Sequence, residues 1–114
     1  MSALTEKHCK PCEGGTEPMN AAQIRDYQQQ IHDDWELGGD GTLIQREFKF
    51  RNYYHTTAFI NAVAWVAHQE DHHPDISFGY NKATVVFTTH AIGGLSENDF
   101  ICAARVDALL PDND

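Results

Sequence analysis

Residues 68–74 read HQEDHHP, and they separate the longest predicted helix from a predicted β-hairpin. The residue before a proline is pushed out of the helical region, so Pro74 requires an extended His73 and places His72 at or just past the helix end. A helix C-terminus carries partial negative charge and favours a protonated imidazole. A histidine at this position can therefore hold a proton for donation near neutral pH.

The helix before this stretch is predicted over residues 52–71. Its apolar residues recur every three or four positions, which is typical of one buried helix face. The members of this face are Phe59, Ala62, Val63, Val66 and Ala67. Three further apolar residues, Ile60, Ala64 and Trp65, fall off it. We therefore expect the helix to be covered on more than one side, and a partner subunit would supply that cover.

The chain after this stretch alternates apolar and polar residues, as a two-stranded hairpin does. A two-residue turn at residues 81–82 would place His73 opposite His90 and would sort the apolar side chains onto one face. We therefore expect His72, His73 and His90 to meet at one end of the hairpin. Asp99 follows after a short loop and could join them.

Three further elements complete the predicted domain. A helix over residues 20–33 begins at a plausible N-cap, Asn20. A first hairpin follows in residues 35–50, with a glycine-rich turn. Ser96 caps the last helix, which carries acidic residues in its first turn. Two antiparallel hairpins with the helices segregated to one face predict an α+β domain.

A chain of 114 residues is long enough for one domain, which we place at residues 20–114 after a flexible leader in residues 1–19. The formal net charge of -9 argues against nucleic acid or an anionic membrane surface as a direct partner. The sequence has no apolar run of about eighteen residues, the length that spans a bilayer, and no stretch like a signal peptide. We therefore expect a cytoplasmic protein.

Cys9 and Cys12 form a C-x-x-C pair inside this leader. The sequence has no second such pair to complete a zinc site. A redox pair would normally stand between a strand and a helix, whereas this one stands in a polar segment with glycine and proline. We interpret the pair as two free thiols, and we expect Cys102 of the last helix to lie in the core.

The histidines allow three interpretations. In the first, they transfer protons: loss of water from a small polar substrate needs an acid and a base, which two imidazoles can supply while Asp99 orients one of them. In the second, His72, His73 and His90 bind zinc or iron with a carboxylate, although neighbouring side chains diverge. In the third, the chain is a non-catalytic interaction protein, which would not need all of these residues.

The spacing of these residues resembles the signature of the pterin-4a-carbinolamine dehydratase family. The residues that carry the resemblance read His68-x3-His72-His73-Pro74-x5-Tyr80-x9-His90-x8-Asp99. The resemblance covers roughly residues 20–110. It implies a four-stranded antiparallel sheet with three helices. It also implies dehydration of 4a-hydroxytetrahydropterin to quinonoid dihydropterin, which recycles the pterin cofactor of aromatic amino acid hydroxylases.

The resemblance also implies roles for single residues. His72 and His90 would be the acid/base pair, His73 would hold the pterin and share in proton transfer, and Asp99 would orient a histidine. We expect Glu70, Asp71 and Thr88 to contact the substrate together with His73. The first position of the signature is often glutamate but is His68 here, so Glu70 or Asp71 could supply that carboxylate.

The resemblance further implies that no metal and no organic cofactor is used. It implies a homodimer or homotetramer with a functional link to phenylalanine hydroxylase. Some members of the family also bind a transcription factor as a dimerisation partner. An interaction module of that kind, or a regulator of hydroxylase expression, is therefore the alternative function.

Overall fold

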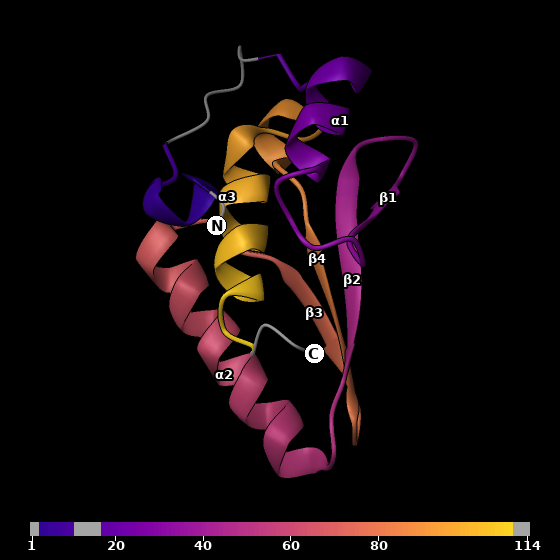
Figure 1. Ribbon diagram of the computed structural model, residues 1–114, viewed down its shortest axis with the longest axis vertical. Coiled ribbons are helices and arrows are strands. Elements are labelled where there is room, and N and C mark those ends of the chain that lie inside the picture. The colour runs from indigo at the N-terminus through magenta and orange to yellow at the C-terminus, as the bar shows by residue number, and fades with distance from the viewer. Residues whose placement is uncertain (1–2, 11–16, 111–114) are drawn as a thin grey trace.

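The computed structural model describes residues 3–10 and 17–110 (Figure 1). Its elements follow in the order 3₁₀ helix η1 (Ala3–Glu6), α1 (Ala21–Gln28), β1 (Glu36–Gly38), β2 (Leu43–Lys49), α2 (Tyr53–Glu70), β3 (Asp75–Phe78), β4 (Lys82–Phe87), 3₁₀ helix η2 (His90–Ile92) and α3 (Glu97–Asp107). In this described part of the chain, no helix is both long and apolar enough to cross a membrane.

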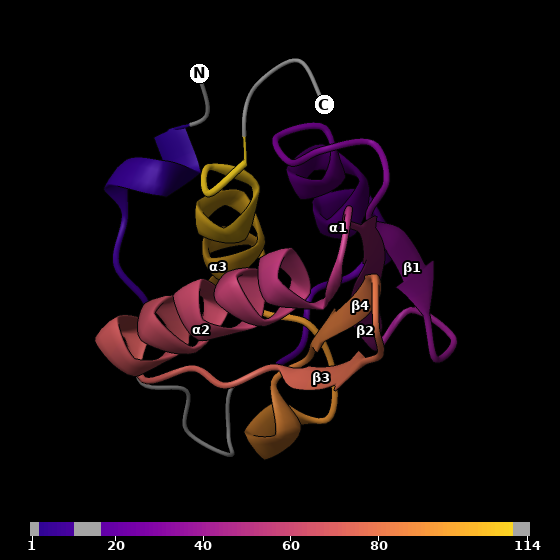
Figure 2. The same ribbon diagram turned by 90° about the horizontal axis from the view of Figure 1, so that it is seen from below.

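The strands form one antiparallel sheet in the order β1-β2-β4-β3. The two predicted hairpins are therefore joined through β2 and β4, and α2 connects one hairpin to the next. Figure 2 shows α2 and α3 on the same face of the sheet, where both contact β4, and α1 packs against α3. This architecture confirms the predicted α+β fold with a four-stranded antiparallel sheet and three helices.

The core lies between the sheet and these helices. Burial alternates along β4, where Ala83, Val85 and Phe87 are buried and the residues between them are half-buried. This is the period of two that a strand with one covered face requires. The predicted face of α2 is also confirmed, since Phe59, Val63, Val66 and Ala67 are buried and Ala62 is half-buried. Trp65, outside that face, is 60% exposed.

Helix α1 begins where the sequence predicts, because the Asn20 side chain accepts from Gln23 N at 2.9 Å in a capping box. It ends at Gln28, however, and the predicted continuation to residue 33 is wrong. Just beyond the helix, the Gln30 N–H donates to the Tyr27 carbonyl at 2.9 Å, three residues back, which is a tighter turn than the α-helical pattern. The His32 N–H donates to Asp107 Oδ2 at 2.9 Å, so α3 draws this segment out of the helical path.

The register predicted for the second hairpin is also wrong. Ile76 pairs with Val85 and Phe78 with Ala83, across a three-residue loop at residues 79–81. This loop is held from outside the hairpin, because Thr56 Oγ1 of α2 donates to the Tyr80 carbonyl at 2.9 Å. The shift is two residues, so each side chain keeps its face. The pairing ends before His90, which lies in η2, and therefore His73 does not stand opposite it.

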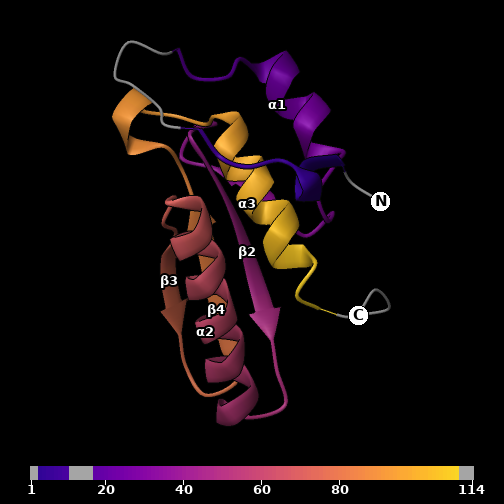
Figure 3. The ribbon, with the colours of Figure 1, turned by 90° about the vertical axis from the view of Figure 1, so that its left-hand side faces the viewer.

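The described part of the predicted leader lies along the helices. The 3₁₀ helix η1 contacts α3, as Figure 3 shows, and Leu4 is only 1% exposed. Residues 11–16, which include Cys12, lie outside the described residues. The division of the chain at residue 20 stays a prediction.

Candidate active site

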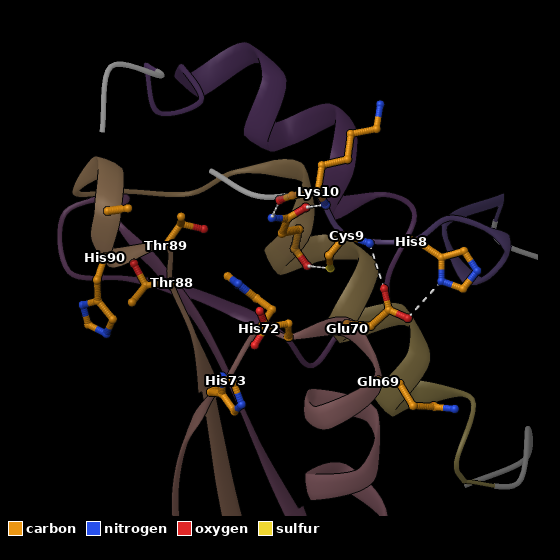
Figure 4. Close-up of a pocket in the computed structure, with 13 residues that line it drawn as sticks. His8, Cys9, Lys10, Gln69, Glu70, His72, His73, Thr88, Thr89 and His90 are labelled. Carbon is orange, nitrogen blue, oxygen red and sulfur yellow. Dashed lines mark hydrogen bonds and ion pairs between the residues drawn. The ribbon is translucent and has the colours of Figure 1, made fainter. Parts of the chain in front are cut away.

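A pocket of about 610 Å³ opens where α2 and β4 end and where the N-terminal segment passes beside α3 (Figure 4). Its lining comprises His8, Cys9, Lys10, Gln69, Glu70, Asp71, His72, His73, Thr88, Thr89, His90, Ala91 and Asn98. All three predicted catalytic histidines are in this lining, and so are Glu70, Asp71 and Thr88. In the view of Figure 4, the threonines and His90 lie on one side and Glu70 and Cys9 on the other.

The end of α2 positions His72. Asp71 is the C-cap and adopts the left-handed conformation, with φ of 51°. The His72 N–H then donates to the Ala67 carbonyl at 3.2 Å, and Pro74 prevents the helix from resuming. His72 therefore stands just past the helix end, as the sequence predicts.

The ring of His72 is held by a carboxylate and an aromatic ring. Its Nε2 lies 2.6 Å from Asp99 Oδ1, and its side chain is 12% exposed against 0% for Asp99. The ring also stacks on Phe87, with centroids 6.1 Å apart and planes 8° apart. Since Asp99 occupies Nε2, the other ring nitrogen is the one free to exchange a proton with a ligand.

Asp99 is itself fixed by the first turn of α3 and the end of β4. Its Oδ2 accepts from the Ser96 N–H at 3.0 Å and from Thr89 Oγ1 at 2.8 Å. Thr89 Oγ1 also lies 2.8 Å from Ser96 Oγ. Asp99 is thus both a first-turn acid of α3 and the partner of His72. Thr89 and Ser96 were missed as site residues, although the Ser96-x-x-Asp99 capping spacing was available as a signal.

His73, His90 and Thr88 reach the pocket from separate segments. His73 is the exposed residue between His72 and Pro74, and His90 is the exposed first residue of η2. Thr88 Oγ1 donates to the Thr42 carbonyl at 2.6 Å, which ties the end of β4 to the first hairpin. The histidines thus meet at one pocket through the helix end and η2, and not through the predicted strand pairing.

His8, Cys9 and Lys10 form the opposite wall, and we call residues 7–10 the N-terminal strap. Glu70, the last residue of α2, holds the strap with a side chain that is 2% exposed. Its Oε1 accepts from the Cys9 N–H at 2.7 Å, and its Oε2 lies 3.1 Å from His8 Nδ1 and 3.5 Å from Arg105 Nε. Glu70 therefore lines the pocket as expected, but its carboxylate is engaged by the strap. No spacing in the sequence marks His8, Cys9 and Lys10 as pocket residues.

The stability that Glu70 contributes by holding the strap depends on pH, because it requires the ionised carboxylate. Burial alone would raise the pKa of Glu70. The Cys9 N–H and the side chains of His8 and Arg105 outweigh this effect, so the pKa is held below its ordinary value of 4.5. A lowered pKa in the folded state means that the carboxylate contributes stability above pH 4.5 and loses that contribution as the pH falls through the folded-state value.

We therefore expect Glu70→Gln to be less stable than the wild type at neutral pH, with a difference that shrinks in acid. The variant keeps the shape of the side chain but has no charge to lose. Denaturant unfolding of both proteins from about pH 7 down to about pH 3 measures the difference. A difference that stays constant over this range would contradict the assigned role of the Glu70 charge.

The arrangement bears on the metal interpretation as well. Among the described residues, no three His, Cys, Asp or Glu side chains are grouped closely enough to hold one metal ion. His72 directs Nε2 to Asp99, and the adjacent His73 belongs to the extended segment that follows.

Comparisons with known proteins identify the family of the chain. A model of the family described as "Pterin 4 alpha carbinolamine dehydratase" matches residues 17–109. The chain is 57% identical over 107 residues to a protein of Nitrosomonas eutropha, across 94% of this chain and 93% of that protein. It is 50% identical over 111 residues to a protein of Legionella pneumophila, and this match covers 97% of this chain and 98% of that protein. Both bear the name "Putative pterin-4-alpha-carbinolamine dehydratase".

Two solved structures have a similar fold. One is a transcriptional coactivator/pterin dehydratase from Brucella melitensis, with a TM-score of 0.78 and 25% identity, covering 83% of this chain and 100% of that one. The other is a pterin dehydratase-like protein identified as a RuBisCO assembly factor in the alpha-carboxysome. Its TM-score is 0.59 at 30% identity, covering 69% of this chain and 94% of that one.

Proposed function

The chain belongs to the pterin 4 alpha carbinolamine dehydratase family, and we propose that it is a hydro-lyase that converts 4a-hydroxytetrahydropterin to quinonoid dihydropterin and water. The observation that carries this proposal is the 2.6 Å contact between His72 and the buried Asp99 at a pocket that His73 and His90 also line. Family membership supports the dehydration, and this contact supports the way in which the chain would perform it.

The dehydration requires two proton transfers. An acid protonates the hydroxyl at C4a so that it leaves as water, and a base removes the proton from the neighbouring ring nitrogen as the carbon–nitrogen double bond forms. We assign these transfers to His72 and His90 without assigning acid and base between them. Asp99 accepts a hydrogen bond from His72 and stabilises its protonated form, as an orienting carboxylate does.

The remaining pocket residues would bind the pterin. His73 is proposed to hold the substrate and to share in proton transfer, with Asp71 and Thr88 beside it in the lining. Glu70 contributes to substrate binding through the strap, because its oxygens already accept from Cys9 and contact His8. The pocket lining comes from the end of α2, the segment that follows β4, the first turn of α3 and the N-terminal strap, and its volume of about 610 Å³ is within the range of small-molecule sites.

A coupled assay tests the proposal. Phenylalanine hydroxylase generates the 4a-carbinolamine, and its dehydration is followed by absorbance with and without this protein, in the presence of a chelator. We expect acceleration that survives the chelator and disappears in the His72→Ala/His90→Ala double variant. Acceleration that the chelator abolishes would establish a metal site instead.

The same assay distinguishes the proposed dehydratase from the alternative function, a non-catalytic interaction module. The similar solved structures include a transcriptional coactivator/pterin dehydratase and a RuBisCO assembly factor, so an interaction module on this fold is a second candidate. That role would not require the buried Asp99 beneath His72. If folded protein gives no acceleration, the interaction module becomes the better account.

We propose further that the pterin comes from an aromatic amino acid hydroxylase and that the chain acts in the cytoplasm as a homodimer or homotetramer. The exposed Trp65 on α2 supports an assembly that covers this helix. Light scattering of the purified chain measures the assembly state.

A further inference from the structure

The N-terminal strap is fastened to α2 and α3 without a covalent bond. Beyond the contacts of Glu70, the Lys10 N–H donates to Asn98 Oδ1 at 3.0 Å, and Asn98 Nδ2 donates back to the Lys10 carbonyl at 2.6 Å. Arg105 Nη2 donates to the Lys7 carbonyl at 2.9 Å. Residues from the chain start are thus held beside Asn98, the neighbour of Asp99, and form one wall of the pocket.

A pair of thiols lies at the centre of this fastening. Cys9 Sγ is 3.6 Å from Cys102 Sγ, and both cysteines are free. Cys102 is buried in α3, while Cys9 is half-buried and lines the pocket. The sulfurs of a disulfide are about 2.0 Å apart, so this contact already brings the two thiols close to bonding distance. In the sequence, Cys9 and Cys12 form a C-x-x-C pair, whereas in the folded chain Cys9 lies beside Cys102.

We propose that Cys9 and Cys102 form a reversible disulfide under peroxide stress, and that this bond locks the strap against α3 as a fixed wall of the pocket. The thiol chemistry does not depend on the proposed reaction, so the inference stands apart from the proposed function.

The reaction balances with hydrogen peroxide as the oxidant. The Cys9 thiolate attacks one peroxide oxygen, the O–O bond breaks, and Cys9 becomes a sulfenic acid with release of hydroxide, which takes up the thiol proton as water. The Cys102 sulfur then attacks the Cys9 sulfur. The S–O bond breaks, the S–S bond forms, and the hydroxyl leaves with the Cys102 proton as a second water.

The two cysteines are suited to different steps. In the reduced pair, the contact with Cys9 and the burial of Cys102 raise the pKa of the Cys102 thiol, so peroxide does not attack Cys102 first. Cys9 is the accessible member and is the one that peroxide reaches first. Cys102 is then already adjacent to resolve the sulfenic acid, before a second peroxide can oxidise it further.

Peptide mapping of the full chain tests the bond. Trypsin does not cut between Lys10 and Pro11, so Cys9 and Cys12 remain together in peptide 8–25, and Cys102 lies in peptide 83–105. The mapping therefore uses Cys12→Ser, with Cys9→Ser as the matched control. After peroxide treatment, we expect the 8–25/83–105 cross-link in Cys12→Ser and its absence in Cys9→Ser. Over-oxidation of Cys9 without this cross-link, or a cross-link only between chains, would overturn the proposal.

Hydrogen exchange tests the effect on the strap. We expect the backbone amides of Cys9 and Lys10 to exchange at least about tenfold more slowly in the oxidised Cys12→Ser protein than in its reduced form. Treatment of Cys102→Ala with peroxide should leave their exchange unchanged. A cross-linked protein whose strap exchanges as fast as the reduced protein would refute the locking of the pocket wall.

Discussion

Replacing His90 by alanine is expected to lower kcat/KM for dehydration by about 10²–10⁴-fold, the usual contribution of a general acid or base. The fold should survive, because His90 is exposed on η2 and removing its ring uncovers no core residue. The rate is measured in the coupled assay, and the thermal unfolding midpoint reports whether the variant is folded.

His55→Ala is the matched control for this variant. His55 is also an exposed histidine, but it lies in the first turn of α2 and does not line the pocket. It should keep the wild-type rate. A His90→Ala protein with wild-type turnover would remove His90 from the acid/base pair and would leave His73 as the candidate partner of His72.

Asp99→Asn is expected to lower kcat by about 10²-fold or more, with KM changed little. The amide can still accept from Thr89 and Ser96, but it has no charge with which to stabilise a protonated His72. KM should hold because Asp99 contacts His72 and is absent from the pocket lining. The coupled assay measures kcat and KM separately. A lower kcat with an unchanged KM indicates that Asp99 positions His72, whereas loss of the fold would abolish both binding and turnover.

The variant Asp99→Ala measures how much Asp99 contributes to the stability of the fold, apart from its effect on catalysis. Without a carboxylate, the Ser96 N–H and the Thr89 hydroxyl lose a buried acceptor, at a cost of about 1–3 kcal/mol for each unsatisfied group. Denaturant unfolding should therefore show a larger loss of stability for Asp99→Ala than for Asp99→Asn. If the two variants are equally destabilised and Asp99→Asn keeps full kcat, Asp99 is a helix cap alone.

The candidate site was partly predictable. His72 and His73 could be located because Pro74 marks the helix end, whereas His90 was expected in a strand opposite His73 and lies in η2 instead. The sequence predicts that Asp99 contacts one of the histidines but not that this histidine is His72, and it does not predict the contacts of Asp99 with Thr89 and Ser96. Hydroxyl groups serve many structural roles, and their direction toward one buried carboxylate depends on how β4 meets α3.

Some element boundaries follow from local chemistry, although the end of α1 at Gln28 does not. Asn20 and Asn52 begin their helices because each side-chain oxygen accepts a backbone N–H three residues on, at 2.9 Å in both cases. Pro74 ends α2, and the alternation of apolar residues selects the buried face of β4. These rules act over a few residues, so the sequence is sufficient to predict them.

Contacts between distant segments required the folded chain. Cys9 meets Cys102 across a separation of 93 residues, the Cys9 N–H meets Glu70 across 61, and Arg46 meets Asp107 at 2.7 Å across 61. No spacing in the sequence marks such pairs, because each depends on how helices, sheet and strap pack together. The sequence thus specified the elements and the histidines, whereas packing set the hairpin register, the wall of the pocket and the thiol pair.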